Sequence, residues 1–160
     1  MRSQFGKKMG AKVIAVSKDR WIKDFGADYI ISEYDKVTEK VNELTQGKMT
    51  DVVLNSLGVQ TWENSFASLG LNGRLVTFGG LTGADVKLNV QSLYSKQIKL
   101  IGCNGGTRKE MTELIDISKE LKTRVWKKFT LDAAKEALQA LFAKERGGRI
   151  LLSVSWMHLN

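Results

Sequence analysis

Short apolar runs alternate with helical patterns along the whole chain. Runs rich in Val, Ile and Leu lie at residues 13–16, 29–31, 51–54, 74–78, 98–101 and 149–152. These runs are apolar at successive positions, which is typical of parallel strands buried between two layers of helices. The pattern therefore predicts strands that are covered on both faces.

The segments between these runs carry apolar residues at spacings of three and four, which predicts amphipathic helices. The spacing occurs at residues 37–44, 62–69, 111–121 and 131–142. Thr107 with Glu110 has the form of a capping box, and Thr130 has the place of another N-cap. Helices are expected to end at four glycines: Gly26, Gly47, Gly70 and Gly147.

This alternation favours an α/β fold with a doubly wound, mostly parallel sheet and right-handed crossovers. The chain opens with a helical stretch at residues 1–9, whereas such a sheet ordinarily begins with a strand. We therefore expect a sheet that is incomplete at its N-terminal strand.

Composition narrows the class of protein. The 160 residues fit one domain, and 42% hydrophobic with 26% charged residues is typical of a folded chain. One Cys and one His form neither an internal disulfide nor a protein-only zinc site. No apolar run approaches the ~20 residues that span a bilayer, and no secretory signal is visible, so a cytoplasmic location is expected.

The net charge gives a weaker indication of the class of ligand. The formal net charge is +8, but the Lys and Arg residues are scattered in pairs with acidic residues between them. This distribution favours a solvated surface or attraction for a polyanionic small molecule over a nucleic-acid site.

The carboxyl ends of the strands come first as candidate ligand sites, because open α/β sheets bind ligands there. Ser17 follows the first run, with Lys18 and Arg20 close behind. A small polar residue with nearby cations suits a ribose 2′-phosphate. Ser17 as a helix N-cap is the alternative, and the two interpretations are compatible.

Glycine-rich turns follow three later runs, at residues 55–58, 79–83 and 102–106. The last precedes a helix start, a place that suits an anion or a carboxamide. Cys103 in that turn is also explained as a small buried apolar residue. His158 is too close to the C-terminus for a catalytic base, and no catalytic constellation or G-x-G-x-x-G motif is present.

Six segments in order resemble the cofactor domain of medium-chain dehydrogenase/reductases, the zinc-type alcohol dehydrogenase and quinone oxidoreductase superfamily. They are GAKVIAVS at 10–17, FGADYII at 25–31, DVVLNSLG at 51–58, GRLVTFG at 73–79, IGCNGGTR at 101–108 and GGRILL at 147–152. The resemblance implies an NAD(P)-binding Rossmann-like domain over residues 1–153, followed by a tail at 154–160.

The resemblance also implies roles for particular residues. Ser17, Lys18 and Arg20 match the ribose position and favour NADP(H) over NAD(H). Other positions match contacts with the remainder of the cofactor: Asn55, Ser56 and Gly58 on the adenosine side; Phe78, Gly79 and Gly80 at the nicotinamide ribose; Gly102, Cys103 and Asn104 at the nicotinamide; and Arg149 at the pyrophosphate.

Three parts of the family's pattern have no match in these residues: the first strand, its glycine loop and the catalytic domain. The resemblance thus implies the C-terminal part of a family member, in which any zinc belongs to the catalytic domain and the chain alone is not expected to be active. In the family's strand order the first strand is central, so strands 13–16 and 29–31 are expected to lose their bridge to 51–54. The exposed edges would favour strand exchange or aggregation.

The function implied is the cofactor-binding portion of an oxidoreductase that orients the nicotinamide for hydride transfer to a carbonyl, enone or quinone. Its partners would be a nicotinamide dinucleotide, a small-molecule substrate held by the missing domain, and further copies in a homo-oligomer. The first alternative is a non-catalytic, truncated remnant that serves as an oligomerisation or interaction module. Nucleic-acid binding is the second.

Overall fold

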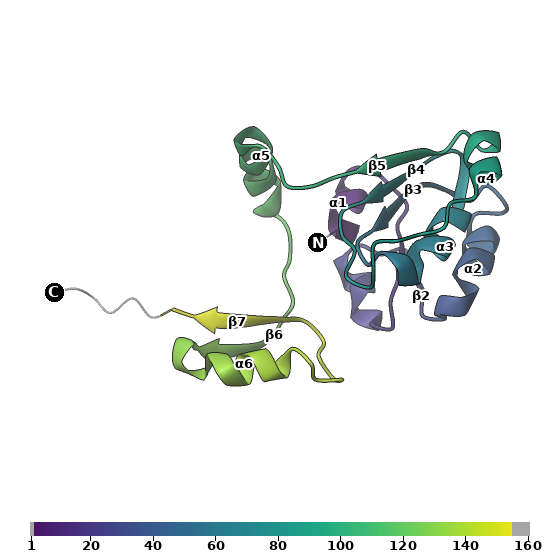
Figure 1. The fold of residues 1–160 in the computed structure, drawn as a ribbon. Helices are drawn as coiled ribbons and strands as arrows, with labels where there is room; N and C mark the ends of the chain where they lie inside the picture. The colour runs from purple at the N-terminus through teal and green to yellow at the C-terminus, as the bar shows by residue number, and fades with distance from the viewer. Residues whose placement is uncertain (1, 155–160) are drawn as a thin grey trace.

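The computed structural model describes residues 2–154 as a main α/β body with a smaller unit set apart from it (Figure 1). Every strand pair is parallel. The strands are β1 (Ile14–Val16), β2 (Tyr29–Ile31), β3 (Thr50–Asn55), β4 (Leu69–Thr77), β5 (Lys99–Gly102), β6 (Val125–Thr130) and β7 (Arg149–Ser153).

The helices alternate with these strands as the sequence pattern predicts. The α-helices are α1 (Arg2–Lys8), α2 (Val37–Leu44), α3 (Val59–Ala67), α4 (Val90–Ser95), α5 (Arg108–Ser118) and α6 (Ala134–Ala140). Short 3₁₀-helices are η1 (Arg20–Phe25), η2 (Tyr34–Lys36) and η3 (Leu131–Ala133). The chain begins with a helix rather than a strand.

The sheet is divided into three parts. β1 pairs with β2, β3–β4–β5 form a three-stranded sheet in that order, and β6 pairs with β7. Because β1 does not pair with β3, the parallel sheet is incomplete, which confirms the expected Rossmann-like α/β class with its missing strand.

Each half of the main body has its own small core. Ile31, Val37 and Val41 pack together beside β1 and β2. Phe66, Leu69, Leu75 and Ile98 form a second cluster beside β3–β5.

The helix layer joins these two halves. Asn64 on α3 donates its Nδ2 to the backbone oxygen of Tyr34 at 2.8 Å, and its Oδ1 accepts from the Thr38 hydroxyl at 3.4 Å. The two halves are therefore linked by α2 and α3 where the sheet is interrupted.

One face of the three-stranded sheet is largely uncovered by the helices of residues 2–154. The register places Leu54, Val76 and Ile101 in one row. Leu54 is 50% exposed, and Ile101 and the nearby Val52 are 40% and 44% exposed. The prediction that these strands are covered on both faces was therefore wrong. Helix α5 leads away from the sheet (Figure 1) instead of covering it.

The local signals at helix ends had mixed outcomes. Gly26 caps η1 with φ 91°, and Thr107 and Glu110 form the expected capping box. Gly70 does not end a helix: α3 ends at Ala67, and Gly70 lies inside β4. There its backbone passes so close to the Lys48 oxygen that a Cβ would collide with it.

The C-terminal strand forms where it is predicted, but in a separate sheet. β7 pairs with β6, which the apolar pattern missed because Lys127 and Lys128 interrupt the run. Helix α6 packs against this pair, so residues 125–153 form a β–α–β unit of their own. Within residues 2–154 no helix is long and apolar enough to cross a membrane.

Candidate functional site

A cavity of about 660 Å³ opens at the carboxyl ends of β4 and β5. The register aligns Asn55, Thr77 and Gly102, so the turns after β3, β4 and β5 begin at one level. Seven residues singled out from the sequence line this cavity: Gly58, Phe78, Gly79, Gly80, Gly102, Cys103 and Asn104. Trp62, Thr77, Gly83, Ala84 and Val86 complete its lining.

Asn55 builds the turn after β3. Its Nδ2 donates to the hydroxyls of Thr61 at 3.1 Å and Ser65 at 3.0 Å. Its Oδ1 accepts from the backbone N–H groups of Leu57 at 3.1 Å and Gly58 at 2.9 Å. The side chain is buried and its hydrogen-bonding positions are filled by the chain itself, so Asn55 shapes the site without reaching into it.

The start of α3 is closed by the loop that follows β4. The Gly83 oxygen accepts from the N–H of Val59 at 3.1 Å, and Thr82 Oγ1 accepts from the N–H of Gln60 at 3.1 Å. Thr82 also donates its hydroxyl to the Leu57 oxygen at 2.7 Å. These contacts occupy the helix donors that would otherwise attract an anion.

Close approach of backbone explains the glycines of the cavity floor. A Cβ on Gly79 would lie 2.6 Å from the Ser56 oxygen. Gly58 has φ 91°, and a Cβ there would collide with the Gly83 oxygen. The turns after β3 and β4 can touch only because these positions carry no side chain.

Arg2 places a cation beside the cavity. Its Nη1 donates to Ser56 Oγ at 3.1 Å, and its guanidinium lies 4.6 Å from the centre of the Phe78 ring. Arg2 was not among the residues expected from the sequence, since it lies more than 50 positions from its contacts and belongs to no motif. The only signal was its position at the start of the first helix.

Ser17, Lys18 and Arg20 lie at the end of β1, in the other half of the body. Ser17 Oγ accepts from the N–H of Asp19 at 3.1 Å, so it supports the turn before η1 while Asp19 itself holds the N-cap position. Lys18 Nζ lies 5.9 Å from the centre of the Tyr34 ring. Lys18 and Arg20 are exposed.

The N-terminus of α5, which follows the turn at 102–106, is already occupied by the carboxylate of Glu110. Glu110 Oε2 accepts from the N–H of Thr107 at 2.6 Å and from its hydroxyl at 2.8 Å. These hydrogen bonds lower the pKa of Glu110 below its ordinary value. The turn therefore offers a ligand the groups of residues 102–104 rather than the helix end.

The structure does not bring Arg149 to this site. Arg149 is the first residue of β7, and its N–H donates to the Arg124 oxygen at 2.9 Å. It belongs to the separate β6–α6–β7 unit (Figure 1) and does not line the cavity.

The described residues do not fit a zinc site. Residues 2–154 contain no group of three or more His, Cys, Asp or Glu side chains that could hold a metal ion. Cys103 is exposed, and His158 lies outside the described residues.

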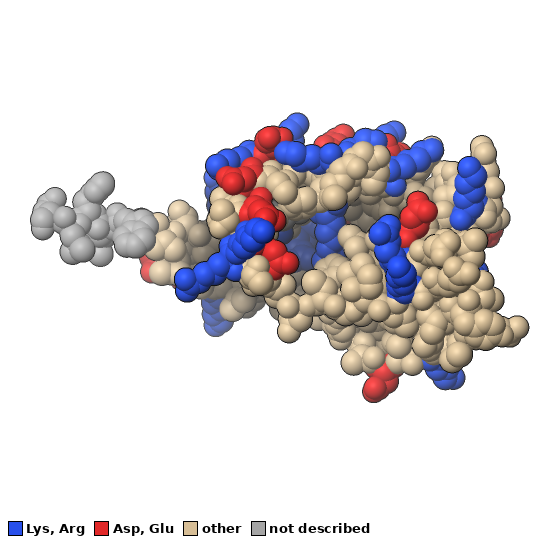
Figure 2. All heavy atoms as spheres, turned by 90° about the horizontal axis from the view of Figure 1, so that it is seen from above, with Lys and Arg blue, Asp and Glu red and all other residues tan. Residues whose placement is uncertain are grey.

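Surface charge is mixed around α5. Figure 2 shows Lys and Arg interleaved with Asp and Glu over this end of the molecule. Lys119 pairs with Asp116 on the helix surface at 2.9 Å. An interleaved surface lacks the dense basic stripe that a phosphate backbone requires.

Comparison with known proteins agrees with the fold. A family model described as zinc-binding dehydrogenase matches residues 1–120. A quinone oxidoreductase of Salmonella typhimurium is 35% identical over 121 residues, covering 69% of this chain and 37% of the relative. An NAD-dependent alcohol dehydrogenase of Sulfolobus acidocaldarius is 30% identical over 138 residues, covering 82% and 39%.

Solved structures show the same likeness. A thermostable alcohol dehydrogenase from Pyrobaculum aerophilum matches with a TM-score of 0.80 and 32% identity over 95% of this chain and 45% of that one. The alcohol dehydrogenase of Aeropyrum pernix has a TM-score of 0.80 at 26% identity, over 92% and 44%. The chain thus spans less than half the length of these relatives, and it belongs to the zinc-binding dehydrogenase family of the medium-chain dehydrogenase/reductase superfamily.

Proposed function

We propose that this chain binds a nicotinamide dinucleotide in the cavity at the carboxyl ends of β4 and β5. One observation carries the proposal: three consecutive strand ends bring seven residues singled out from the sequence into a single cavity. Its volume of about 660 Å³ lies within the range of roughly 300–1,000 Å³ typical of ligand pockets.

The residues of the cavity suit distinct parts of the cofactor. Gly79 and Gly80 allow a ribose to approach the backbone closely, and Asn104 carries a carboxamide that can pair with that of the nicotinamide. The Phe78 ring offers an apolar surface. The bound nicotinamide would supply hydride transfer, and the chain would supply its orientation.

Arg2 supplies the cation for the pyrophosphate in this proposal. No G-x-G-x-x-G motif occurs in the sequence, and the α3 start is closed by residues 82–83. The Arg2 guanidinium, held between Ser56 and Phe78, is the cation that would face the pyrophosphate.

Ser17, Lys18 and Arg20 would receive the 2′-phosphate of NADP(H) at the end of β1. Their exposure leaves both cations available to an anion. In a longer protein the hydride would be exchanged with a carbonyl, enone or quinone, in keeping with the printed names of the quinone oxidoreductase and alcohol dehydrogenase relatives.

A titration of the 160-residue chain with NADPH and then NADH tests the proposal. Trp62 lines the cavity, so its fluorescence should report occupancy. We expect saturable quenching at lower concentrations of NADPH than of NADH. Tighter NADH binding would overturn the role of Ser17, Lys18 and Arg20, and no response to either by the folded chain would overturn the function.

The Arg2→Glu variant distinguishes a specific contact by Arg2 from a general effect of net charge. Loss of a charge-assisted hydrogen bond and reversal of its charge should weaken NADPH binding by about tenfold or more. Arg146→Glu changes net charge equally at an exposed residue of the loop before β7. Equal weakening in both variants would show a general charge effect and exclude a specific contact by Arg2.

A further inference from the structure

The β6–α6–β7 unit is attached to the main body through α1. Within residues 2–154, the hydrogen bonds and ion pairs that join residues 119–154 to residues 2–107 come from Gln4 and Lys8. Figure 1 shows that the extended segment after α5 passes the main body beside α1. A helix at the start of the chain therefore anchors a unit at its end.

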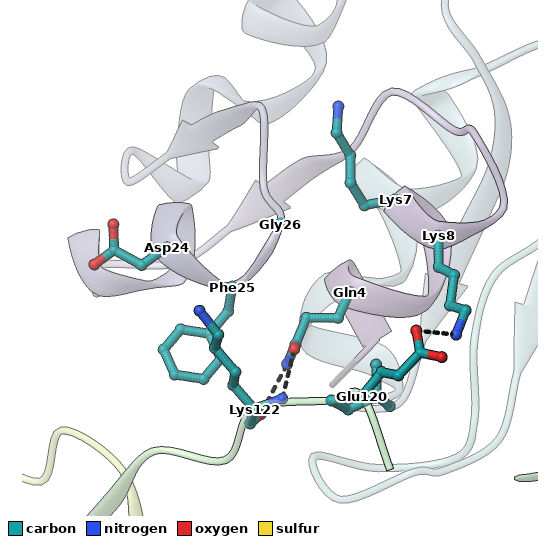
Figure 3. A pocket seen from close by; sticks show the side chains of 9 residues that line it. Gln4, Lys7, Lys8, Asp24, Phe25, Gly26, Glu120 and Lys122 are labelled. Atoms are coloured by element: carbon teal, nitrogen blue, oxygen red, sulfur yellow. Dashed lines mark hydrogen bonds and ion pairs between the residues drawn. The ribbon is translucent and has the colours of Figure 1, made fainter. Parts of the chain in front are cut away.

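The Gln4 side chain both donates a hydrogen bond to the backbone of this segment and accepts one from it. Its Nε2 donates to the Lys122 oxygen at 2.9 Å, and its Oε1 accepts from the Lys122 N–H at 2.8 Å. Figure 3 shows the Gln4 side chain directed at Lys122, and both residues line a cavity of about 320 Å³. A carboxamide that satisfies both backbone groups of one residue imitates a strand partner and fixes the residue's orientation as well as its position.

A second contact extends the attachment to the end of the unit. The Arg124 guanidinium lies 5.2 Å from the centre of the Trp21 ring on η1. Its Nε donates to the Gly147 oxygen at 2.6 Å. Arg124 thus connects η1 to the loop that leads into β7.

The elements that receive these contacts are themselves fixed. Ser3 on α1 donates its hydroxyl to the Phe25 oxygen at 2.7 Å, and Lys7 pairs with Asp28 at 2.5 Å. Trp21 meets Phe25 edge to face, with ring centres 5.3 Å apart. The Lys8–Glu120 pair is exposed on both sides and adds little.

We propose that Gln4 is the positioning residue that sets the orientation of the β6–α6–β7 unit relative to the β3–β5 sheet, through its hydrogen bonds with both backbone groups of Lys122. The contact of the Arg124 guanidinium with the Trp21 ring supports the same orientation. This role is independent of whether a cofactor binds.

Residual dipolar couplings of the 160-residue chain test the orientation. In the unaltered protein, amides of β6 and β7 should fit the alignment tensor obtained from β3–β5. In Gln4→Ala they should need a separate tensor, reduced about twofold or more. Alanine is a good helix former, so α1 should remain intact. Gln91→Ala on α4 is the matched control, because Gln91 is exposed and makes no side-chain hydrogen bond among the described residues.

A single shared tensor in folded Gln4→Ala would overturn the proposal, as would separate tensors in the unaltered protein. Amide exchange supplies a test that needs no variant. The N–H of Lys122 should exchange on the order of tenfold more slowly than that of Thr123, which has no hydrogen-bond partner within residues 2–154. Equal exchange of the two amides would also overturn it.

Discussion

Asn55 has four side-chain hydrogen bonds with its own chain, and these define its role. The sequence indicated a small polar residue at a strand end, which suits a ribose or a turn equally well. Only its partners, which come from the turn and from α3, decide between the two. Asn55 is a positioning residue for the cavity, whereas Gly58, three residues later, lines it.

Asn55→Ala should therefore destabilise the fold by about 1–3 kcal/mol, because it leaves the buried N–H of Gly58 without its acceptor. The midpoint of urea unfolding measures the change. Asn42→Ala removes the same group from an exposed position on α2 and should change stability little. Equal effects of the two substitutions would contradict the role given to Asn55.

Local sequence singled out Gly58 and Gly79 because glycine allows a ligand to approach the backbone closely. In the structure both positions instead approach another part of the chain's own backbone. Arg2 was not identified, because its contacts with Ser56 and Phe78 form only when α1 is placed beside β3 and β4. Contacts between distant residues leave no such local signal.

At the scale of elements, α5 shows which part of a helix its own sequence determines. The capping box is local to Thr107 and Glu110, and it forms as predicted. The apolar spacing implied a face packed on the sheet, yet Met111 is 56% and Ile115 is 52% exposed. Amphipathicity shows that a helix has an apolar face, but not which surface covers it.

The start of α5 should depend on pH through Glu110. Hydrogen bonds from Thr107 hold the folded pKa of Glu110 below its unfolded value. The stabilisation is therefore complete above about pH 4.3 and is lost as the pH falls through the folded pKa. The amide shift of Thr107, followed by NMR, should change over this acid range.

Glu110→Gln should remove that dependence, since glutamine does not titrate. Glu113→Gln removes the same charge from the same helix without touching the cap, and it should leave the Thr107 titration intact. Persistence of the titration in Glu110→Gln would show that another group causes it.

At the scale of the whole molecule, the expected break between the first two strands and the 51–54 strand is present, but the separate pairing of β6 with β7 was not predicted. Periodicity identifies a strand such as β7 and contains no information on its neighbour, which is β6 rather than β5. The break between β1 and β3 leaves two small cores connected by α2 and α3. Among the described residues, the expected second helix layer leaves the row of Leu54, Val76 and Ile101 largely uncovered.

This open apolar face should make the chain associate as its concentration rises. Sedimentation velocity over a concentration series should show a growing share of species larger than the 17.9 kDa monomer. Leu54→Lys should shift the distribution toward the monomer, because a charge then stands in the middle of the face. Leu71→Lys, at a residue 65% exposed outside the Leu54–Val76–Ile101 row, should not. An equal shift in both would indicate a general effect of solubility.

The place of Cys103 makes the molecule easy to label. It is the single cysteine in 160 residues, it is exposed, and it lines the cavity. A thiol-directed dye or spin label will attach at that one point without prior mutagenesis. The slowing of its attachment when a ligand is added then reports how far that ligand fills the cavity.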